Sequence, residues 1–107
     1  MNSHAHLLVM YPTPKDPKAF DRAYREEHLP YAGPRLEGAL GVVSKRVAKT
    51  QGGPQSYYAI SDVTFPSLSV LQACAASAGG QQALAHAASI STGGPPAILV
   101  ITDDFAA

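Results

Sequence analysis

The sequence predicts a single α+β domain with the ferredoxin-like order β-α-β-β-α-β. The chain has 107 residues, which suffices for one domain and is too short for two, so we expect one domain over residues 1–107. Apolar residues make up 46% of it, enough to form a core. Segments typical of strands and segments typical of helices follow one another along the chain in this order. That order gives a four-stranded antiparallel sheet with both helices on one face.

The first strand is expected at Leu7–Tyr11, an apolar run stopped by Pro-Thr-Pro. Asp16 and Pro17 then favour a helix start, because Asp caps the first amides and Pro suits the first helical position. We expect this helix to run to about His28. The residue that precedes Pro30 is biased away from helical angles, so the helix should end there.

The middle of the chain predicts a long hairpin. Residues 33–38 should form a turn, and Ala39–Lys49 the second strand. Residues 50–55 are turn-forming and connect to a third strand at Tyr57–Phe65, which is rich in aromatic and β-branched residues.

The last third predicts a second helical region and a final strand. The region opens at Pro66 and Ser67, is Ala-rich through Ser77, and should be interrupted at Gly79-Gly80 before it resumes over 81–88. A Gly-Gly-Pro-Pro segment breaks the chain again. Ala97–Thr102 is then the fourth strand.

The first and last strands predict a homodimer. A strand with one wet face alternates apolar and polar residues, yet 7–10 and 97–101 are apolar throughout. Both faces of these strands need cover, and the two helices supply it on one face only. A second copy packed against the other face covers it through one symmetric contact. A larger monomeric core closed by loops is the alternative, but the loops are short and rich in Gly and Pro.

Composition excludes several classes of partner. Lys+Arg and Asp+Glu each count 8, so a basic surface for nucleic acid is not expected. No apolar run approaches the roughly 20 residues that span a bilayer, so we expect no membrane association. The one cysteine, Cys74, cannot form an internal disulfide and is expected to be a buried thiol. We therefore expect a cytoplasmic protein.

No motif indicates a cofactor. The sequence contains no glycine-rich nucleotide loop and no zinc-binding pattern, so we expect neither a bound cofactor nor a metal. His4 and His6 lack an evident third ligand, which favours a solvated N-terminus. His86 is expected on the surface of the Ala-rich helix. A lone His is able to bind haem axially, but nothing marks His86 for that role.

One arc of the first helix carries the candidate site. At 100° per residue the following residues share that arc: Phe20, Ala23, Tyr24, Glu27, His28 and Tyr31. Tyr31 belongs to it only if the turn continues past Pro30. In one interpretation Glu27 and His28 are half wet and complement the helix end. In the other, aromatic rings line a pocket between helix and sheet, with His28 as its polar group.

Two stretches resemble the EthD family. The first is Tyr11-Pro12-x-Pro14-x-Asp16-x4-Asp21-x2-Tyr24-x3-His28-x-Pro30, with Phe20 inside it, and its Tyr…His-x-Pro part is the most specific. The second is Phe65-x-Ser67-Leu68-x3-Gln72-x4-Ser77-x2-Gly80, followed by Thr92-Gly93-Gly94. The resemblance covers essentially the whole chain. It departs at Pro66, where the family often has an acidic residue, which affects the helix cap and not the fold.

The resemblance implies a dimeric α/β barrel. EthD is named for a small protein encoded with a haem monooxygenase system for ether degradation, and members are often labelled reductases or oxidoreductases. The pocket residues expected here are Tyr11, Phe20, Tyr24, Glu27 and Tyr31, with His28 as the catalytic acid or base. Related barrels include quinone-forming monooxygenases, muconolactone isomerases and polyketide cyclases, so the fold does not fix the reaction.

Three functions follow as hypotheses. The first is a cofactor-independent oxidoreductase that acts on a small, mostly apolar organic molecule, with His28 moving protons. A lactone isomerase or polyketide-cyclase-like enzyme is a variant of it. The second is a non-catalytic accessory protein that holds such a molecule for a partner redox enzyme. The third is a dimer whose pocket is incidental.

Overall fold

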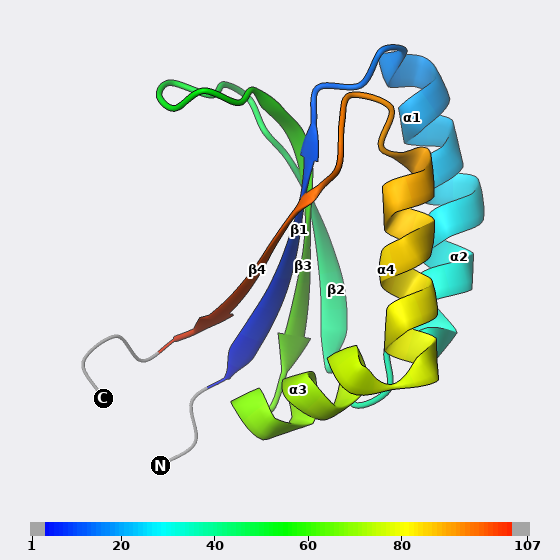
Figure 1. The fold of residues 1–107 in the computed structure, drawn as a ribbon, viewed down its shortest axis with the longest axis vertical. Helices are drawn as coiled ribbons and strands as arrows, with labels where there is room; N and C mark the ends of the chain where they lie inside the picture. The colour runs from blue at the N-terminus through cyan, green and yellow to red at the C-terminus, as the bar shows by residue number, and fades with distance from the viewer. Residues whose placement is uncertain (1–3, 104–107) are drawn as a thin grey trace.

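The chain forms one four-stranded sheet with its helices gathered on one side (Figure 1). The structure is a computed structural model that describes residues 4–103. Its elements are β1 Ala5–Pro12, α1 Pro17–Ala23, η1 Tyr24–His28, α2 Leu29–Ala32, η2 Gly33–Arg35, β2 Gly41–Arg46, β3 Tyr57–Phe65, α3 Leu68–Ala76, α4 Ala78–Ile90 and β4 Ala97–Thr102. The strands lie in the order β2-β3-β1-β4 with every neighbouring pair antiparallel. The predicted ferredoxin-like fold is confirmed.

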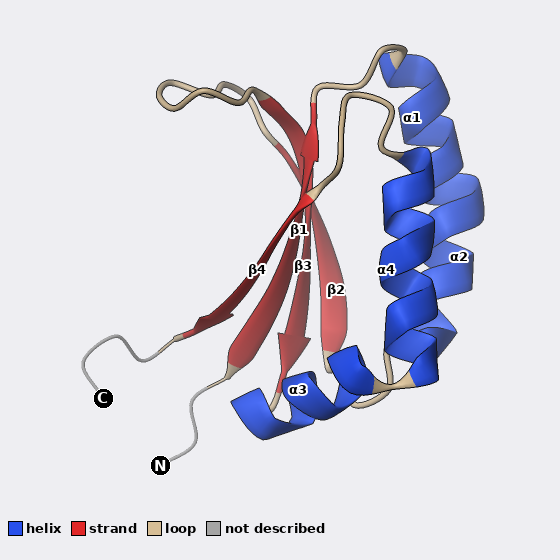
Figure 2. Cartoon of the chain, viewed as in Figure 1, coloured by secondary structure: helices blue, strands red, loops and turns tan. Residues whose placement is uncertain are grey.

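Strand register assigns the side chains to two faces. In antiparallel strands, paired residues point to the same face and neighbours along the strand alternate. Leu7 pairs with Val63, and both are buried beneath the helices. Leu8 pairs with Asp62 and with Leu99 on the opposite face. That opposite face carries no helix, as Figure 2 shows.

The edge strand β4 is apolar on both faces and open to solvent on both. Its four exposed apolar residues are Ile98, Leu99, Val100 and Ile101, at 41%, 43%, 51% and 38% exposure. The helices reach β1 and β3 but leave β4 uncovered. In the structure, as the sequence predicts, β4 has apolar residues on two faces that the helices do not cover.

Strand limits differ from the predictions in two places. β3 and β4 have the expected bounds, and β1 extends the expected run at both ends. β2 is shorter than the expected Ala39–Lys49 and spans Gly41–Arg46. The amide of Ala39 donates to the carbonyl of Leu36, so the start of the predicted strand belongs to a turn.

The first helical region continues beyond the predicted end at His28. Leu29 has helical angles (φ −59°, ψ −45°), and helical structure continues to Arg35. The cause is the π-helical segment η1, in which the amide of Leu29 bonds to the carbonyl of Tyr24, five residues back. This wider turn relieves the contact between the Pro30 ring and the preceding turn that would end an α-helix.

Side-chain caps begin three of the helices. Asp16, Ser67 and Ser77 each accept a hydrogen bond from the backbone amide three residues later, at 3.2, 3.3 and 3.0 Å. The Ser77 cap starts α4 and places the break between α3 and α4 at Ser77, not at the predicted Gly79-Gly80. Gly80 lies inside α4, where a Cβ would overlap the carbonyl of Cys74. The glycine permits close packing rather than ending a helix.

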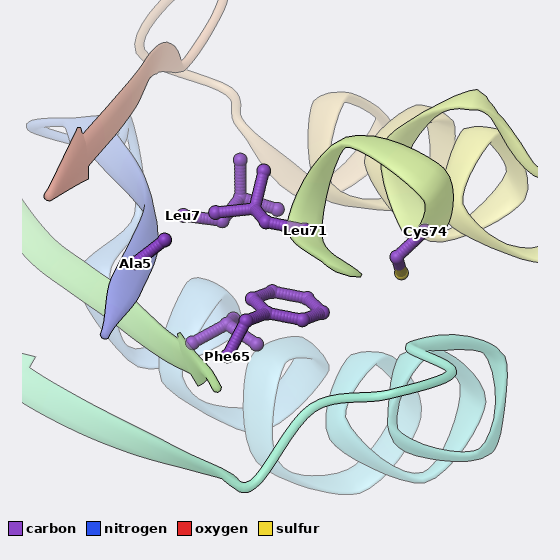
Figure 3. Close-up of a cluster of buried hydrophobic side chains, with 6 residues drawn as sticks. Ala5, Leu7, Phe65, Leu71 and Cys74 are labelled. Atoms are coloured by element: carbon purple, nitrogen blue, oxygen red, sulfur yellow. The ribbon is translucent and has the colours of Figure 1, made fainter. Parts of the chain in front are cut away.

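One core cluster joins the sheet to α3 (Figure 3). Phe65 and Leu71 are its large members and are buried almost completely, next to Ala5 and Leu7 of β1. Cys74 completes the cluster and is buried, as predicted. Burial raises the pKa of its thiol. This cluster fixes α3 across one end of the sheet and leaves the middle of the sheet to η1, α2 and α4.

The helix-free face carries an ionic cluster around His6. We predicted that His4 and His6 are both solvated. This is correct for His4, whose side chain is 54% exposed, and wrong for His6, whose side chain is 18% exposed. The Nδ1 of His6 lies 2.8 Å from Oδ1 of Asp62, and its Nε2 lies 2.9 Å from Oδ1 of Asp103. The hydrogen bond with Asp62 raises the pKa of His6 although burial opposes it.

Candidate functional site

A cavity of about 240 Å³ lies between the sheet and the helical layer. Its polar side chains are His28 of η1, Ser44 of β2 and Ser61 of β3. Most of the remaining wall is apolar and comes from both layers, including Leu7, Val9, Val63, Ala83, Leu84 and Ala87. A concave, mostly apolar site with a few convergent polar groups is typical of small-molecule binding.

Ser44 and Ser61 meet because their strands pair in register. They are directly opposite each other on β2 and β3. The hydroxyl of Tyr24 lies 2.6 Å from Oγ of Ser44 and 2.7 Å from Oγ of Ser61. Each of these oxygens is able to donate one hydrogen bond and accept others. The bridge therefore fixes the Tyr24 ring against the sheet at one side of the cavity.

His28 ends η1 and is 5% exposed. Its Nε2 lies 3.4 Å from the hydroxyl of Tyr11, a buried residue of β1. Its Nδ1 lies 2.9 Å from Nδ1 of His86 on α4. Both ring nitrogens thus have partners, and the bond to His86 is the shorter one. The contact with Tyr11 is long for a hydrogen bond, which makes Nε2 the nitrogen more open to competition by a ligand.

The environment keeps His28 neutral. Burial, and then the neighbouring His86, lowers the pKa of His28 to about 4. Burial also raises the pKa of Tyr11, so this phenol keeps its proton. At neutral pH the site therefore contains an uncharged imidazole and an uncharged phenol. A neutral imidazole has one donor nitrogen and one acceptor nitrogen.

The sequence places His28 by four-residue spacing in the first helical region. The rings of Phe20 and Tyr24 stack at 5.8 Å, and those of Tyr24 and His28 also lie 5.8 Å apart. An α-helix would rotate residues four apart slightly past each other. The π-helical turn of η1 advances each residue by less, and it leaves the rings of Tyr24 and His28 at the same separation as those of Phe20 and Tyr24.

Two predicted pocket residues lie elsewhere. Glu27 is exposed on the outer side of the helix and does not line the cavity, because the slower rotation of η1 carries it away from the sheet. Tyr31 is half-buried and lies outside the cavity wall. It stacks on His86 at 4.6 Å, with the guanidinium of Arg35 3.7 Å from its ring centroid. The prediction of Glu27 and Tyr31 as pocket residues is corrected accordingly.

The other predicted aromatic residues surround His28 without lining its cavity. Tyr11 is buried, and its hydroxyl contacts Nε2 of His28. Phe20 and Tyr24 line a second cavity of about 160 Å³ at the β2 edge, together with Ser44 and Arg46. Of the six predicted site residues, His28 is the one in the wall of the larger cavity.

Sequence reasoning missed three polar members of the site: Ser44, Ser61 and His86. Ser44 and Ser61 interrupt apolar strands on the side that faces the helices, and their alternation with valines is a signal that was available. His86 lies between the buried Ala83 and Ala87, on the inward side of α4. Alanines occur on all sides of α4, so its sequence does not show which side faces the sheet, and the inward position of His86 could not be predicted.

No metal site is evident in the described part of the chain. Over residues 4–103, no group of three or more His, Cys, Asp or Glu side chains is arranged to hold an ion. The His28–His86 pair offers two nitrogens that already bond to each other. Over the same residues, no helix is long and apolar enough to cross a membrane.

Solved structures of other proteins have the same fold as this chain. A protein of Bacillus halodurans described as belonging to the EthD family matches with a TM-score of 0.80 and 19% identity, over 94% of this chain and 99% of that one. An EthD-like protein of Ralstonia eutropha matches with a TM-score of 0.66 and 18% identity, over 94% and 92%. This chain has the EthD fold. The subunit fold implied by the sequence resemblance is thereby confirmed.

Two further proteins resemble this chain, one in structure and one in sequence. A dimeric ferredoxin-like protein of unknown function from Jannaschia matches with a TM-score of 0.62 and 18% identity, over 94% of this chain and 98% of that one. An uncharacterized 11.0 kDa protein in the thcB-thcC intergenic region of Rhodococcus erythropolis is 29% identical over 98 residues, 92% of each chain. No family model matches the chain.

Proposed function

We propose that this chain is an EthD-like protein that binds a small, mostly apolar organic molecule in the cavity beside His28. The observation that carries the proposal is the cavity wall. It is apolar except for His28, Ser44 and Ser61, and these three belong to one region of hydrogen-bonded side chains. Such a wall favours an apolar ligand body with a polar group at one end.

The volume of the cavity limits the ligand. An apolar protein cavity of about 150 Å³ is large enough to bind benzene. A cavity of about 240 Å³ therefore suits a molecule with one substituted ring. A hydroxyl or carbonyl group on that ring would meet the serine hydroxyls or Nε2 of His28. Phenols, hydroquinones and small lactones have this size and chemistry.

His28 is the residue through which the site would catalyse a reaction. Its imidazole is neutral, is held against Tyr24, and has its weaker hydrogen bond at Nε2. A ligand hydroxyl that replaces Tyr11 at this nitrogen would have a proton acceptor in contact with it. Removal of a proton from a hydroquinone is the step that a cofactor-independent oxidoreductase requires of its protein. This supports the oxidoreductase hypothesis.

An accessory binding role is the second candidate. It is favoured by one observation: both nitrogens of His28 already have partners within the protein. A protein that only holds a molecule for a partner redox enzyme needs the cavity and the serines but no free base. The two candidates share the binding step and differ in turnover.

We also propose that the protein acts as a homodimer. The apolar residues of β4 are exposed on both faces, and the helix-free face of the sheet includes Leu8 and Leu99. A monomer seldom leaves this many apolar side chains of one strand open. Packing of this face against a second copy would cover it and complete a barrel of two sheets. The Jannaschia protein, which shares the fold, is dimeric.

Binding and turnover are tested separately. Native mass spectrometry with phenol, hydroquinone and a γ-lactone should show one ligand per chain for the wild type. Ala83→Leu fills the cavity and should abolish binding, whereas Ala85→Leu, on the exposed side of the same helix, should not. Oxygen uptake or product formation from the bound ligand would establish an enzyme. Binding without turnover would establish the accessory role.

A further inference from the structure

The imidazole rings of His28 and His86 meet edge to edge. Their planes differ by 12° and their centroids lie 5.1 Å apart, while the two Nδ1 atoms lie 2.9 Å apart. The centroid distance exceeds the nitrogen distance by about the width of one ring. Two rings that share a plane and join through their Nδ1 atoms have this geometry. The contact is therefore an N–H···N hydrogen bond with a single proton between the nitrogens.

This bond couples the tautomers of the two residues. A neutral His28 donates through one nitrogen and accepts through the other, so its bonds to Tyr11 and to His86 must run in the same direction. In one direction Tyr11 donates to Nε2 and Nδ1 donates to His86. In the other, His86 donates to Nδ1 and Nε2 donates to Tyr11.

The chemistry of Tyr11 selects the direction. A phenol that keeps its proton is able to donate, and the two groups beside the Tyr11 hydroxyl are the Ser61 hydroxyl and Nε2 of His28. The imidazole lone pair is the stronger acceptor of the two. Tyr11 therefore donates to Nε2 of His28. The proton of His28 must then be on Nδ1, where it is donated to Nδ1 of His86, and the proton of His86 must be on Nε2.

We propose that His86 is a positioning residue that holds His28 in the Nδ1–H tautomer, so that the lone pair of Nε2 is available to a ligand hydroxyl. The role of that lone pair toward a ligand rests on the proposed function, whereas the tautomer itself does not. The outer face of His86 is held by the stacked ring of Tyr31. Three other ionisable side chains contact the histidine pair among the described residues, Tyr11, Tyr24 and Tyr31, and Arg35 lies over the far side of this group on the Tyr31 ring.

The hydrogen-bonded histidine pair also provides a path for a proton, and the charge of the pair is the same before and after the transfer. When Nε2 of His28 takes a proton from the ligand, its Nδ1 proton passes to Nδ1 of His86. His86 then releases its Nε2 proton to water. One proton enters the pair and one leaves it, and the ligand keeps the negative charge. At no point are both imidazoles cations, because two positive charges this close would repel each other.

The tautomer is measured by ¹⁵N NMR of the histidine rings in the ligand-free protein. In the wild type, His28 should carry its proton on Nδ1. His86→Phe keeps a ring against Tyr31 but removes the acceptor, so a proton on Nδ1 would be buried without a partner. His28 should then change to the Nε2–H form, which still bonds to the oxygen of Tyr11. In His86→Gln the amide oxygen accepts from Nδ1, so the wild-type tautomer should return. Tyr31→Phe is the matched control and should leave the tautomer unchanged.

Phenol and toluene, which have nearly the same shape, test the consequence for the ligand. His86→Phe should weaken phenol binding about fivefold and leave toluene unaffected, because one neutral hydrogen bond is lost. An Nε2–H tautomer in wild-type His28, an Nδ1–H tautomer in His86→Phe, or an unchanged ratio of phenol to toluene affinity would overturn the proposal. If neither molecule binds, the proposed function fails, and the NMR result still decides the role of His86.

Discussion

The Nδ1 atoms of His28 and His86 lie 2.9 Å apart, so η1 and α4 are joined by a hydrogen bond between two imidazoles. The bond lies beside a cavity whose other polar groups are two serines held by Tyr24. Burial of His28, and then the neighbouring His86, lowers the pKa of His28. The stability of the fold and the properties of the candidate site therefore depend on the same side chains.

His28→Ala should destabilise the protein. The side chain is buried, and its removal leaves Tyr11 and His86 without their common partner. Loss of a buried hydrogen-bonding group costs about 1–3 kcal/mol. Urea denaturation at fixed protein concentration measures this loss. A loss of unfolding free energy below about 0.5 kcal/mol would show that His28 does not stabilise the fold through these hydrogen bonds.

Acid should remove the contribution of His28 to stability. The folded pKa, about 4, lies below the ordinary value of 6.5, so the unfolded chain binds more protons between these values. Stability from this residue is therefore full above pH 6.5 and is lost as the pH falls toward 4, on the order of 3 kcal/mol in total.

His28→Gln isolates this effect. The difference between the unfolding free energies of wild type and variant removes the titration of the carboxylates, which both proteins share. That difference should shrink from pH 7 to pH 4. His6 titrates in the opposite sense, because its raised pKa makes its contribution decline as the pH rises through that value. A pH-independent difference would show that His28 is not buried in its neutral form.

Tyr24→Phe should cost about 1–2 kcal/mol while it preserves the stack of rings. The variant keeps the ring between Phe20 and His28 but leaves Ser44 and the buried Ser61 without their bridge. Tyr58→Phe is the control, because its hydroxyl bonds to the more exposed Asp21. Thermal or urea unfolding of the two variants should rank Tyr24→Phe as the more destabilised. Equal losses would mean that the bridge contributes little.

Leu99→Asp should dissociate the proposed dimer. Leu99 is 43% exposed and lies opposite Leu8 on the helix-free face, where a second copy would bury it. Burial of an unpaired carboxylate costs several kcal/mol. Light scattering should report about twice the chain mass for the wild type and the chain mass for the variant. Leu68→Asp changes a leucine of similar exposure, 38%, on α3 and should remain dimeric.

The fold was largely predictable because its signals are local. β3 is rich in aromatic and β-branched residues, β4 is apolar, each follows a segment rich in Gly and Pro, and their bounds matched. His28 was found through its four-residue spacing from Tyr24. The π-helical turn was not predictable, because an analysis at 100° per residue assumes an α-helix, and it therefore assigned Glu27 to the inner side. His86 was missed because its partner is 58 residues away in sequence.

The most direct test of the account is a ¹³C-methyl NMR titration of the wild-type protein with phenol. The account predicts saturable shifts at methyl groups of the cavity wall, those of Leu7, Val9 and Leu84, with one phenol bound per chain. The same titration of Ala83→Leu should show none, and that of Ala85→Leu should resemble the wild type. Shifts that do not saturate, that lie outside the cavity wall, or that persist in Ala83→Leu would contradict a binding site beside His28.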